Sequence, residues 1–199
     1  RRGPGRIQEV TGDLDGAIAA LRRGEVVAYP TETFYGLGVD AFNVAALERV
    51  RAVKGRGEKA ISVLVDGEAM LARLCAEIPP RARALMARHW PGALTLALPA
   101  RPGLPEALVS DGCIAVRQSP HPLARALVAG FGGPVTTTSA NRSGEPPATT
   151  AAAVRAALGD ACHVLDGGPT PGGAPSTLAR VRGDSIEILR AGAVDLAGA

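Results

Sequence analysis

Short apolar runs alternate with helical patterns along most of the chain, but the last apolar runs follow one another too closely for helices between them. Residues 14–21 carry apolar side chains at helical spacing, whereas only a few residues separate the apolar runs 177–181 and 186–189. Parallel neighbours in a sheet need a crossover of about a dozen residues or more. We therefore expect an α/β fold with a twisted, mixed parallel/antiparallel sheet that is flanked by helices.

Apolar periodicity and the positions of capping residues set the boundaries of the expected elements. Thr11 or Asp13 can cap the first helix, and Asn43 can cap the second, which ends at Gly55. The expected helices are 14–21, 44–54, 80–90, 123–128 and 150–158, and the expected strands are 26–29, 61–65, 94–98, 114–116, 164–165, 177–181 and 186–189.

The length of 199 residues suits one domain, so we expect residues 1–199 to form a single domain in which 1–6 are a loose tail. Hydrophobic residues make up 46% of the chain but aromatic residues only 3%, so the core must consist mainly of Ala, Val and Leu. No run of about 18 apolar residues could span a membrane, and no signal segment opens the chain. Its three cysteines lack the spacing of a zinc site or a disulfide framework, so a cytoplasmic location is expected.

Three polar segments follow predicted strands or helices, and we interpret them as loops that form a binding site. The densest is 136–144, Thr-Thr-Thr-Ser-Ala-Asn-Arg-Ser-Gly, which has almost no apolar side chain to bury. Such a loop is costly to hold in one shape unless its polar groups bind something. Thr137, Ser139 and Asn141 alternate along the chain, which places them on one side of an extended segment.

The second segment, 30–38, supplies Thr31 and Thr33 directly after the first strand, followed by Gly36 and Gly38. The glycines would let the backbone approach a ligand closely. Threonines in a turn can instead bond their own backbone, so the sequence leaves open which of the two contacts a ligand.

The third segment, 54–59, places Lys54, Arg56 and Lys59 at the end of a helix. Gly55 allows a left-handed exit, so that Lys54 and Arg56 can project together from an exposed loop as a clamp on phosphates. Cations also cap helix C-termini without any ligand, which is the alternative interpretation.

Arg117 ends the predicted strand 114–116, where it can either grip a ligand carboxylate or form an ordinary ion pair. His121, just beyond, is expected to be a structural residue at a helix start. The net charge of +3 favours anionic ligands such as nucleotides. There is no phosphate-binding glycine motif of the P-loop or dinucleotide type, no ordered set of hydrolytic residues and no His-rich metal cluster. These absences favour chemistry in which the protein supplies position and charge.

Seven segments together resemble the YrdC/TsaC family of threonylcarbamoyl-AMP synthases, in the family's order. They are YPTETFYGLG, KGR, WPGALTLAL, AVRQSPHP, TTTSANRSG, STLARV and ILRAGAV. The resemblance implies a YrdC-like fold in its short, single-domain form. It also implies a nucleotidyltransferase that forms threonylcarbamoyl-AMP and pyrophosphate from L-threonine, bicarbonate or CO2, and ATP, for threonylcarbamoyladenosine modification of tRNA.

The resemblance also assigns roles to individual residues. It implies that Lys54 and Arg56 are catalytic, and it gives one set of residues for ATP and another for threonine. The ATP set is Lys54, Arg56, Lys59, Ser139, Asn141 and Arg190, and the threonine set is Thr31, Thr33, Arg117, Thr137 and Ser176. Mg2+ is expected to arrive with ATP, without a dedicated protein metal site. In one departure, Gly57 follows Arg56 where the family usually has Pro, in a shortened loop.

The implied product would pass to separate proteins that transfer the threonylcarbamoyl group to tRNA; a weak direct contact with RNA is left open, and no membrane partner is expected. Two alternatives remain at this point. One is a carbamoyl-adenylating module like that of HypF, although no acylphosphatase or zinc-finger segment accompanies this chain. The other is an RNA-binding or ribosome-associated factor, although the candidate loops show no aromatic stacking pattern.

Overall fold

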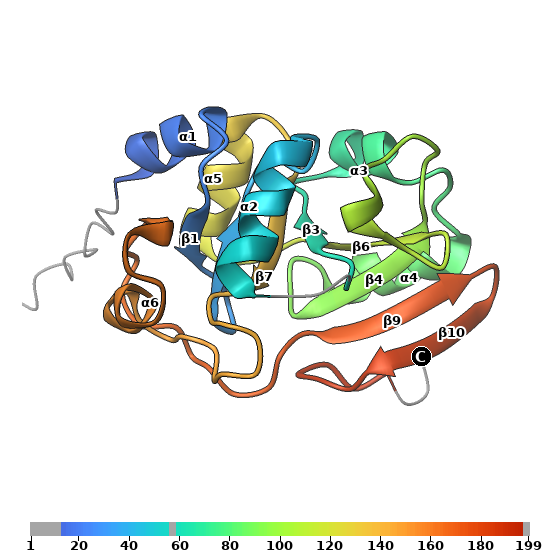
Figure 1. Ribbon diagram of the computed structural model, residues 1–199. Helices are drawn as coiled ribbons and strands as arrows, with labels where there is room; N and C mark the ends of the chain where they lie inside the picture. The colour runs from blue at the N-terminus through green and yellow to red at the C-terminus, as the bar shows by residue number, and fades with distance from the viewer. Residues whose placement is uncertain (1–12, 56–58, 197–199) are drawn as a thin grey trace, which may run out of the picture.

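The computed structural model describes residues 13–55 and 59–196, whose strands form one ten-stranded sheet (Figure 1). The order is β10-β9-β4-β6-β3-β7-β2-β1-β8, with β5 paired to β6 beside this path. The strands are β1 (Val27–Pro30), β2 (Tyr35–Gly38), β3 (Ser62–Leu64), β4 (Leu94–Pro99), β5 (Val109–Ser110), β6 (Cys113–Arg117), β7 (Val135–Ser139), β8 (His163–Val164), β9 (Thr177–Arg182) and β10 (Ser185–Arg190). The pairs β1–β8, β3–β6 and β4–β9 are parallel and the others antiparallel, so the predicted mixed sheet is confirmed.

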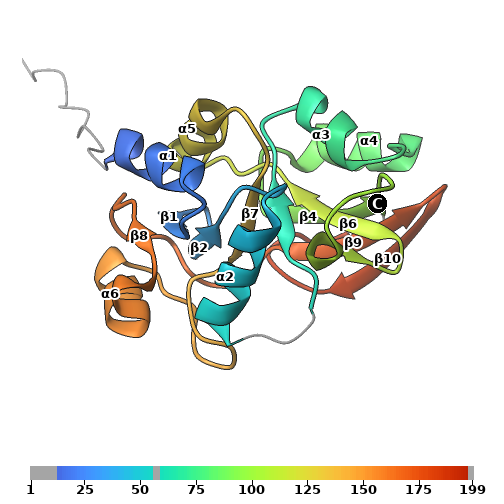
Figure 2. The same ribbon diagram turned by 45° about the horizontal axis from the view of Figure 1, so that its top comes forward.

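Helices flank the sheet, as the sequence predicts (Figure 2). They are α1 (Leu14–Arg22), α2 (Val44–Lys54), α3 (Glu68–Leu74), α4 (Pro80–His89), α5 (Pro122–Phe131) and α6 (Ala151–Leu158), with single 3-10 turns at Glu106–Leu108 and Gly159–Ala161. Asp13 caps α1 by accepting from Gly16 N at 2.9 Å, and Asn43 caps α2 by accepting from Ala46 N at 3.1 Å. Helix α3 and strand β5 were not predicted.

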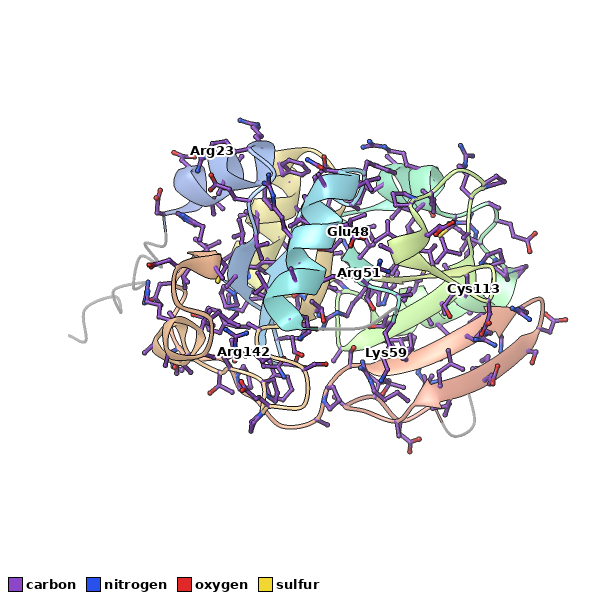
Figure 3. The ribbon with its side chains drawn as sticks, in the orientation of Figure 1. Arg23, Glu48, Arg51, Lys59, Cys113 and Arg142 are labelled. Carbon is purple, nitrogen blue, oxygen red and sulfur yellow. The ribbon has the colours of Figure 1, made fainter. Side chains whose placement is uncertain are left out.

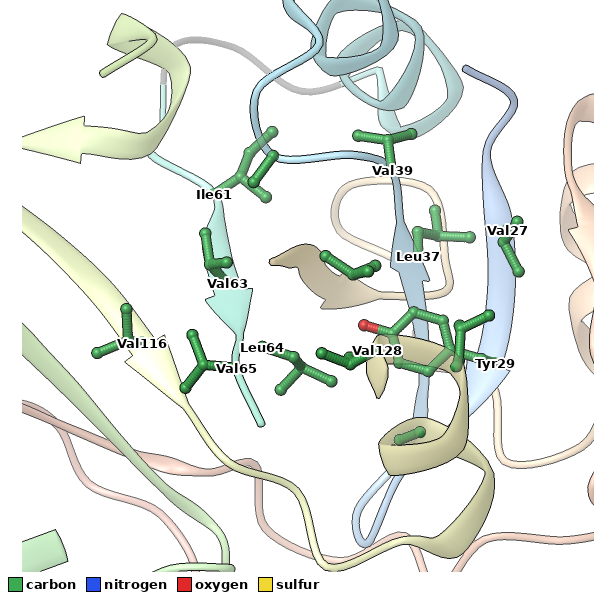
Figure 4. Close-up of a cluster of buried hydrophobic side chains, with 14 of the residues drawn as sticks. Val27, Tyr29, Leu37, Val39, Ile61, Val63, Leu64, Val65, Val116 and Val128 are labelled. Carbon is green, nitrogen blue, oxygen red and sulfur yellow. The ribbon is translucent and has the colours of Figure 1, made fainter. Parts of the chain in front are cut away.

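The core lies between the sheet and its helices and consists mostly of Ala, Val and Leu (Figure 4). Its largest members are Tyr29 and Tyr35, both fully buried. Each buried hydroxyl has a backbone partner, because Tyr29 Oη donates to Thr136 O at 2.8 Å and Tyr35 Oη donates to Gly168 O at 2.7 Å. Burial raises the pKa of both Tyr29 and Tyr35, so their hydroxyls remain neutral hydrogen-bond donors inside the core.

Two of the segments interpreted as loops are partly strands, which corrects the sequence-based expectation. Residues 35–38 form β2, in a tight hairpin with β1, and residues 135–139 form β7 between β2 and β3. The three threonines of β7 are β-branched and therefore suit a strand. Their polarity favours a loop, but their backbone groups pair with β2 on one side and β3 on the other.

Gly38 serves close packing rather than the approach of a ligand, which also corrects the expectation. A Cβ at this position would lie 2.6 Å from Val135 Cγ1, 2.7 Å from Thr136 O and 2.7 Å from Tyr29 Cε1. Side chain, backbone and ring thus close the space on β2 that any larger residue would need.

Gly38→Ala is expected to lower the free energy of unfolding by about 2–3 kcal/mol, because the overpacked sheet must shift. Urea unfolding followed by circular dichroism measures this change. Gly67→Ala is the matched control, since Gly67 is extended and an added Cβ there meets nothing within 4 Å. It should cost less than about 1 kcal/mol, the value of a helix cap. Equal losses in both variants would contradict the packing argument.

Candidate functional site

An open cleft of about 570 Å³ crosses the middle of the sheet and collects residues from both halves of the chain. Every predicted site residue that the structure describes lines it. These are Thr31, Thr33, Lys54, Lys59, Arg117, Thr137, Ser139, Asn141, Ser176 and Arg190. Arg56, the remaining predicted residue, lies outside the described residues. The cleft therefore unites segments that are up to 159 positions apart, counted from Thr31 to Arg190.

The chemical character of the cleft is cationic and rich in hydroxyl groups. Among the described residues that line it, four are Lys or Arg and none is Asp or Glu. Lys59 is exposed at the rim, and Figure 3 shows it with Arg142 beyond the C-terminal end of α2. A concave surface with cations and no opposing carboxylates favours an anionic ligand.

Lys54 is buried, which corrects the expectation that it projects from an exposed loop. It is the last residue of α2 and is only 4% exposed, while Gly55 takes the predicted left-handed conformation with φ 58°. Its Nζ donates to Ser139 O at 2.6 Å, Asn141 O at 3.1 Å and Asn141 Oδ1 at 3.0 Å. The ammonium thus binds the segment that follows β7 from within the protein.

This segment is held by side chains of its own as well. Ser139 Oγ donates to Asn141 Oδ1 at 2.6 Å, and Asn141 Nδ2 donates to Glu145 O at 2.5 Å. Ser143 N donates to Lys54 O at 2.8 Å, which ties the turn back to α2. Ser139 and Asn141, whose polarity suggests a ligand site in the sequence, therefore have partners within the protein, and Lys54 binds both of them.

The two threonines of the turn between β1 and β2 differ in their contacts. Thr31 Oγ1 donates to Phe34 O at 2.7 Å, accepts from Thr33 N at 3.3 Å and lies 3.2 Å from Thr33 Oγ1. The proton of the Thr31 hydroxyl is thus committed to the backbone, as in other turns closed by a side-chain hydroxyl. Within the described residues the Thr33 hydroxyl forms no hydrogen bond to the backbone, so its oxygen is the more available of the two in the cleft.

Arg117 ends β6, as predicted, and its guanidinium forms an ion pair with Glu32. Glu32 Oε2 also accepts from Ser119 Oγ at 2.5 Å. Neither Glu32 nor Ser119 was predicted to be a site residue. His121 is structural, as expected, because its Nδ1 caps α5 by accepting from Leu123 N at 3.3 Å, and burial lowers the pKa of its imidazole.

Ser176 and Arg190 lie together in the lining of the cleft. Arg190 Nη2 donates to Ser176 O at 2.8 Å and to Ser176 Oγ at 3.1 Å. Thr95, which the sequence analysis missed, lies 2.8 Å from Ser176 through their hydroxyl oxygens. The sequence signal for Thr95 as a site residue was weak, because it is a single hydroxyl inside the apolar run of β4.

In the described ranges 13–55 and 59–196, no three His, Cys, Asp or Glu side chains come together as a metal site. No helix in this part of the chain is long and apolar enough to cross a membrane.

The chain is similar to known proteins over most of its length. The Sua5_yciO_yrdC family model, described as "Telomere recombination", matches residues 19–192. The threonylcarbamoyl-AMP synthase of Chromohalobacter salexigens is 45% identical over 189 residues, which cover 92% of this chain and 100% of that protein. The protein of the same name from Bacillus subtilis is 41% identical over 182 residues, which cover 89% of this chain and 53% of that protein.

A solved structure of a Sua5 protein has a similar fold. The structure of P. abyssi Sua5 complexed with L-threonine superposes with a TM-score of 0.88 at 34% identity, covering 93% of this chain and 55% of that chain. The chain therefore spans little more than half of that Sua5 protein and of the Bacillus relative, but all of the Chromohalobacter relative. Since the family model and the two relatives agree over most of its length, the chain belongs to the Sua5/YciO/YrdC family.

Proposed function

We propose that this chain is an L-threonylcarbamoyladenylate synthase, and that it uses the cleft to join threonine, bicarbonate or CO2, and ATP. The observation that carries this proposal is a cleft lined by cations and hydroxyls and, in the described chain, by no carboxylate. Further support comes from relatives named threonylcarbamoyl-AMP synthase and from a Sua5 structure complexed with L-threonine.

The proposed reaction draws its nucleophile from the substrates. The threonine amine adds to CO2 and gives an N-carboxylate, with the amine proton passing to solvent. A carboxylate oxygen then attacks the α-phosphorus of MgATP, a new P–O bond forms, and the bond to the pyrophosphate breaks. The products are threonylcarbamoyl-AMP and magnesium pyrophosphate. Positioning and charge stabilisation are what the protein must provide, and they are what a cleft of this composition offers.

In this proposal one group of residues binds the nucleotide and another binds threonine. The nucleotide and its phosphates are bound by Lys59, Arg190 and the turn of Ser139 and Asn141, with Lys54 contributing charge from beneath that turn. Arg56 is retained as a phosphate ligand from the sequence alone. Threonine is bound by the hydroxyls of Thr33, Thr137 and Ser176 and by Arg117. A nucleotidyltransferase of this kind would act in the cytoplasm and pass its product to tRNA-modifying partners.

The two alternatives have less support. The described lining of the cleft contains the aromatic residues Phe34 and Tyr35, but the Tyr35 hydroxyl binds the backbone and its ring is fully buried. A buried ring cannot stack on a base, as single-stranded RNA binding requires, so the half-buried Phe34 has no second aromatic ring beside it in the described lining to build a stacking surface. For the HypF-like alternative, the relatives' names favour threonine over carbamoyl phosphate as the substrate.

The direct test is incubation of the chain with MgATP, L-threonine and bicarbonate, with pyrophosphate detection and mass analysis of the adenylate. Formation of threonylcarbamoyl-AMP that requires all three substrates is the expected result. Replacing threonine by carbamoyl phosphate is the control for the HypF-like alternative. Pyrophosphate release with carbamoyl phosphate and none with threonine would overturn the proposal.

Thr33→Val is expected to raise the KM for threonine about tenfold or more, because a polar group of the bound substrate loses its partner. Thr31→Val should instead lower stability by about 1 kcal/mol, the value of one hydrogen bond, since that hydroxyl closes the turn on Phe34. Steady-state kinetics and urea unfolding of both isosteric variants separate the two effects. The opposite pattern would show that Thr31 is the contact with threonine.

A further inference from the structure

Glu32 is the one acidic residue of the turn between β1 and β2, and side chains bind both of its carboxylate oxygens. Oε1 accepts from Arg117 Nη1, and Oε2 accepts from Ser119 Oγ at 2.5 Å. Ser119 Oγ itself accepts from His121 N at 3.2 Å, just before α5 begins. The Glu32 carboxylate is therefore fixed by two contacts, and Arg117 is paired with a carboxylate that cannot rotate freely.

This ion pair is shielded from solvent. The Glu32 side chain is 15% exposed and that of Arg117 is 6% exposed. Removing two charges from water is costly, and apolar residues of similar size often serve stability as well or better. Stability alone is thus a weak reason for such a pair. What the ion pair does for the site is geometric. A guanidinium held at one nitrogen by a fixed carboxylate keeps one orientation.

The orientation leaves part of Arg117 unsatisfied. In the described structure its Nε is buried and has no hydrogen-bond partner, although most buried polar groups in proteins have one. Arg117 also lines the cleft, whereas Glu32 does not. Because Arg117 lines the cleft and Glu32 holds its Nη1, the guanidinium is well suited to receive a ligand carboxylate through donors other than Nη1.

We propose that Glu32 is a positioning residue for the amino-acid substrate: through its ion pair it orients Arg117, whose remaining donors bind the carboxylate of threonine. This inference rests on the proposed function and deepens it, because it adds Glu32 and Ser119 to the part of the site that selects the substrate. Glu32 touches no reacting atom. Its effect therefore passes entirely through Arg117.

Two consequences separate this role from a structural one. Loss of Glu32 should raise the KM for threonine and leave the KM for ATP unchanged. The same substitution should have no further effect on threonine once Arg117 is absent, because residues that act through one another are not additive.

The test compares E32A, E32Q, S119A, R117A and the double variant E32A/R117A by steady-state kinetics, with threonine binding measured by calorimetry. E32A should raise the threonine KM roughly tenfold to a hundredfold, the range found for residues that orient the ligands of metal sites. E32Q keeps an acceptor for Arg117 and should fall between E32A and wild type. S119A should cause a smaller rise, since it frees only one carboxylate oxygen.

E68Q is the matched control, because Glu68 pairs with Arg83 at 2.7 Å on the surface and its side chain is 81% exposed. It should behave as wild type. E32Q and S119A keep the inference testable if E32A fails to fold, which a thermal melt of each variant would show. Under that condition, a threonine KM unchanged in both variants overturns the inference.

An unchanged threonine KM in folded E32A overturns it as well, as does an equal rise in the presence and absence of Arg117. These outcomes presuppose a wild-type chain that forms the adenylate. A wild-type chain that neither forms the adenylate nor binds threonine would overturn the proposed function, and this inference with it.

Discussion

Replacing Lys54 by Met is expected to destabilise the protein and to abolish most adenylate formation at the same time. The methionine side chain keeps the unbranched shape of Lys54, one atom shorter, but cannot donate to Ser139 O, Asn141 O or Asn141 Oδ1. Buried acceptors that lose a charged donor cost about 1.5–3 kcal/mol each, so a total of about 3–5 kcal/mol is expected after partial relaxation.

The effect on activity follows from the same contacts. Ser139 and Asn141 lie in the turn that Lys54 holds, and they are proposed to bind ATP. A displacement of about 1 Å in a positioning group can cost about a hundredfold in rate, so at least that loss is expected. Urea unfolding gives the first quantity, and pyrophosphate release under saturating substrates gives the second.

Lys59→Met is the control for this prediction, since Lys59 lines the same cleft but is exposed. It should change the free energy of unfolding by less than about 0.5 kcal/mol, as surface substitutions usually do. If Lys54→Met were as stable as wild type and merely inactive, Lys54 would act on the substrate alone. The interpretation of Lys54 as part of a phosphate clamp would then be the better one.

Local signals in the sequence predicted the elements that depend on local physics. Asn43 and Gly55 begin and end α2 as expected, because a side-chain cap and a left-handed glycine act within one turn of the helix. The mixed sheet was predictable from the short spacing between β9 and β10. By contrast, β2 and β7 were missed, since glycines and threonines resemble a loop unless the strands that pair with them are known.

The partners of the site residues were the part that sequence could not supply. Arg117 and Glu32 are 85 positions apart, and so are Lys54 and Ser139. The residues near Arg117 or Lys54 in the sequence do not indicate which distant group each of them contacts. The sequence indicated that these residues belong to a site, but the structure shows that Lys54 holds a turn and that Arg117 is paired. Position in the cleft was thus predictable, whereas the network within it depended on the fold.

The second large effect concerns the choice of amino acid. Valine has nearly the shape of threonine but carries a methyl group in place of the hydroxyl. The cleft presents buried hydroxyls at Thr33, Thr137 and Ser176, which are 7–8% exposed. A site built to bind a hydroxyl rejects an analogue without it by about 10⁴-fold, because its own polar groups lose their partner. We therefore expect the kcat/KM for valine to be lower than that for threonine by at least about a thousandfold.

Serine distinguishes this explanation from one based on shape. It keeps the hydroxyl and lacks only one methyl group, worth about 0.8 kcal/mol, so its kcat/KM should fall by less than about tenfold relative to threonine. Adenylate formation with the three amino acids under identical conditions, quantified by mass analysis, gives the order directly. Thr33→Val should narrow the gap between threonine and valine, since it removes one of the hydroxyls that discriminate. Equal turnover of valine and threonine by the wild-type chain would show that these hydroxyls do not bind the substrate side chain, and the threonine set would have to be reassigned.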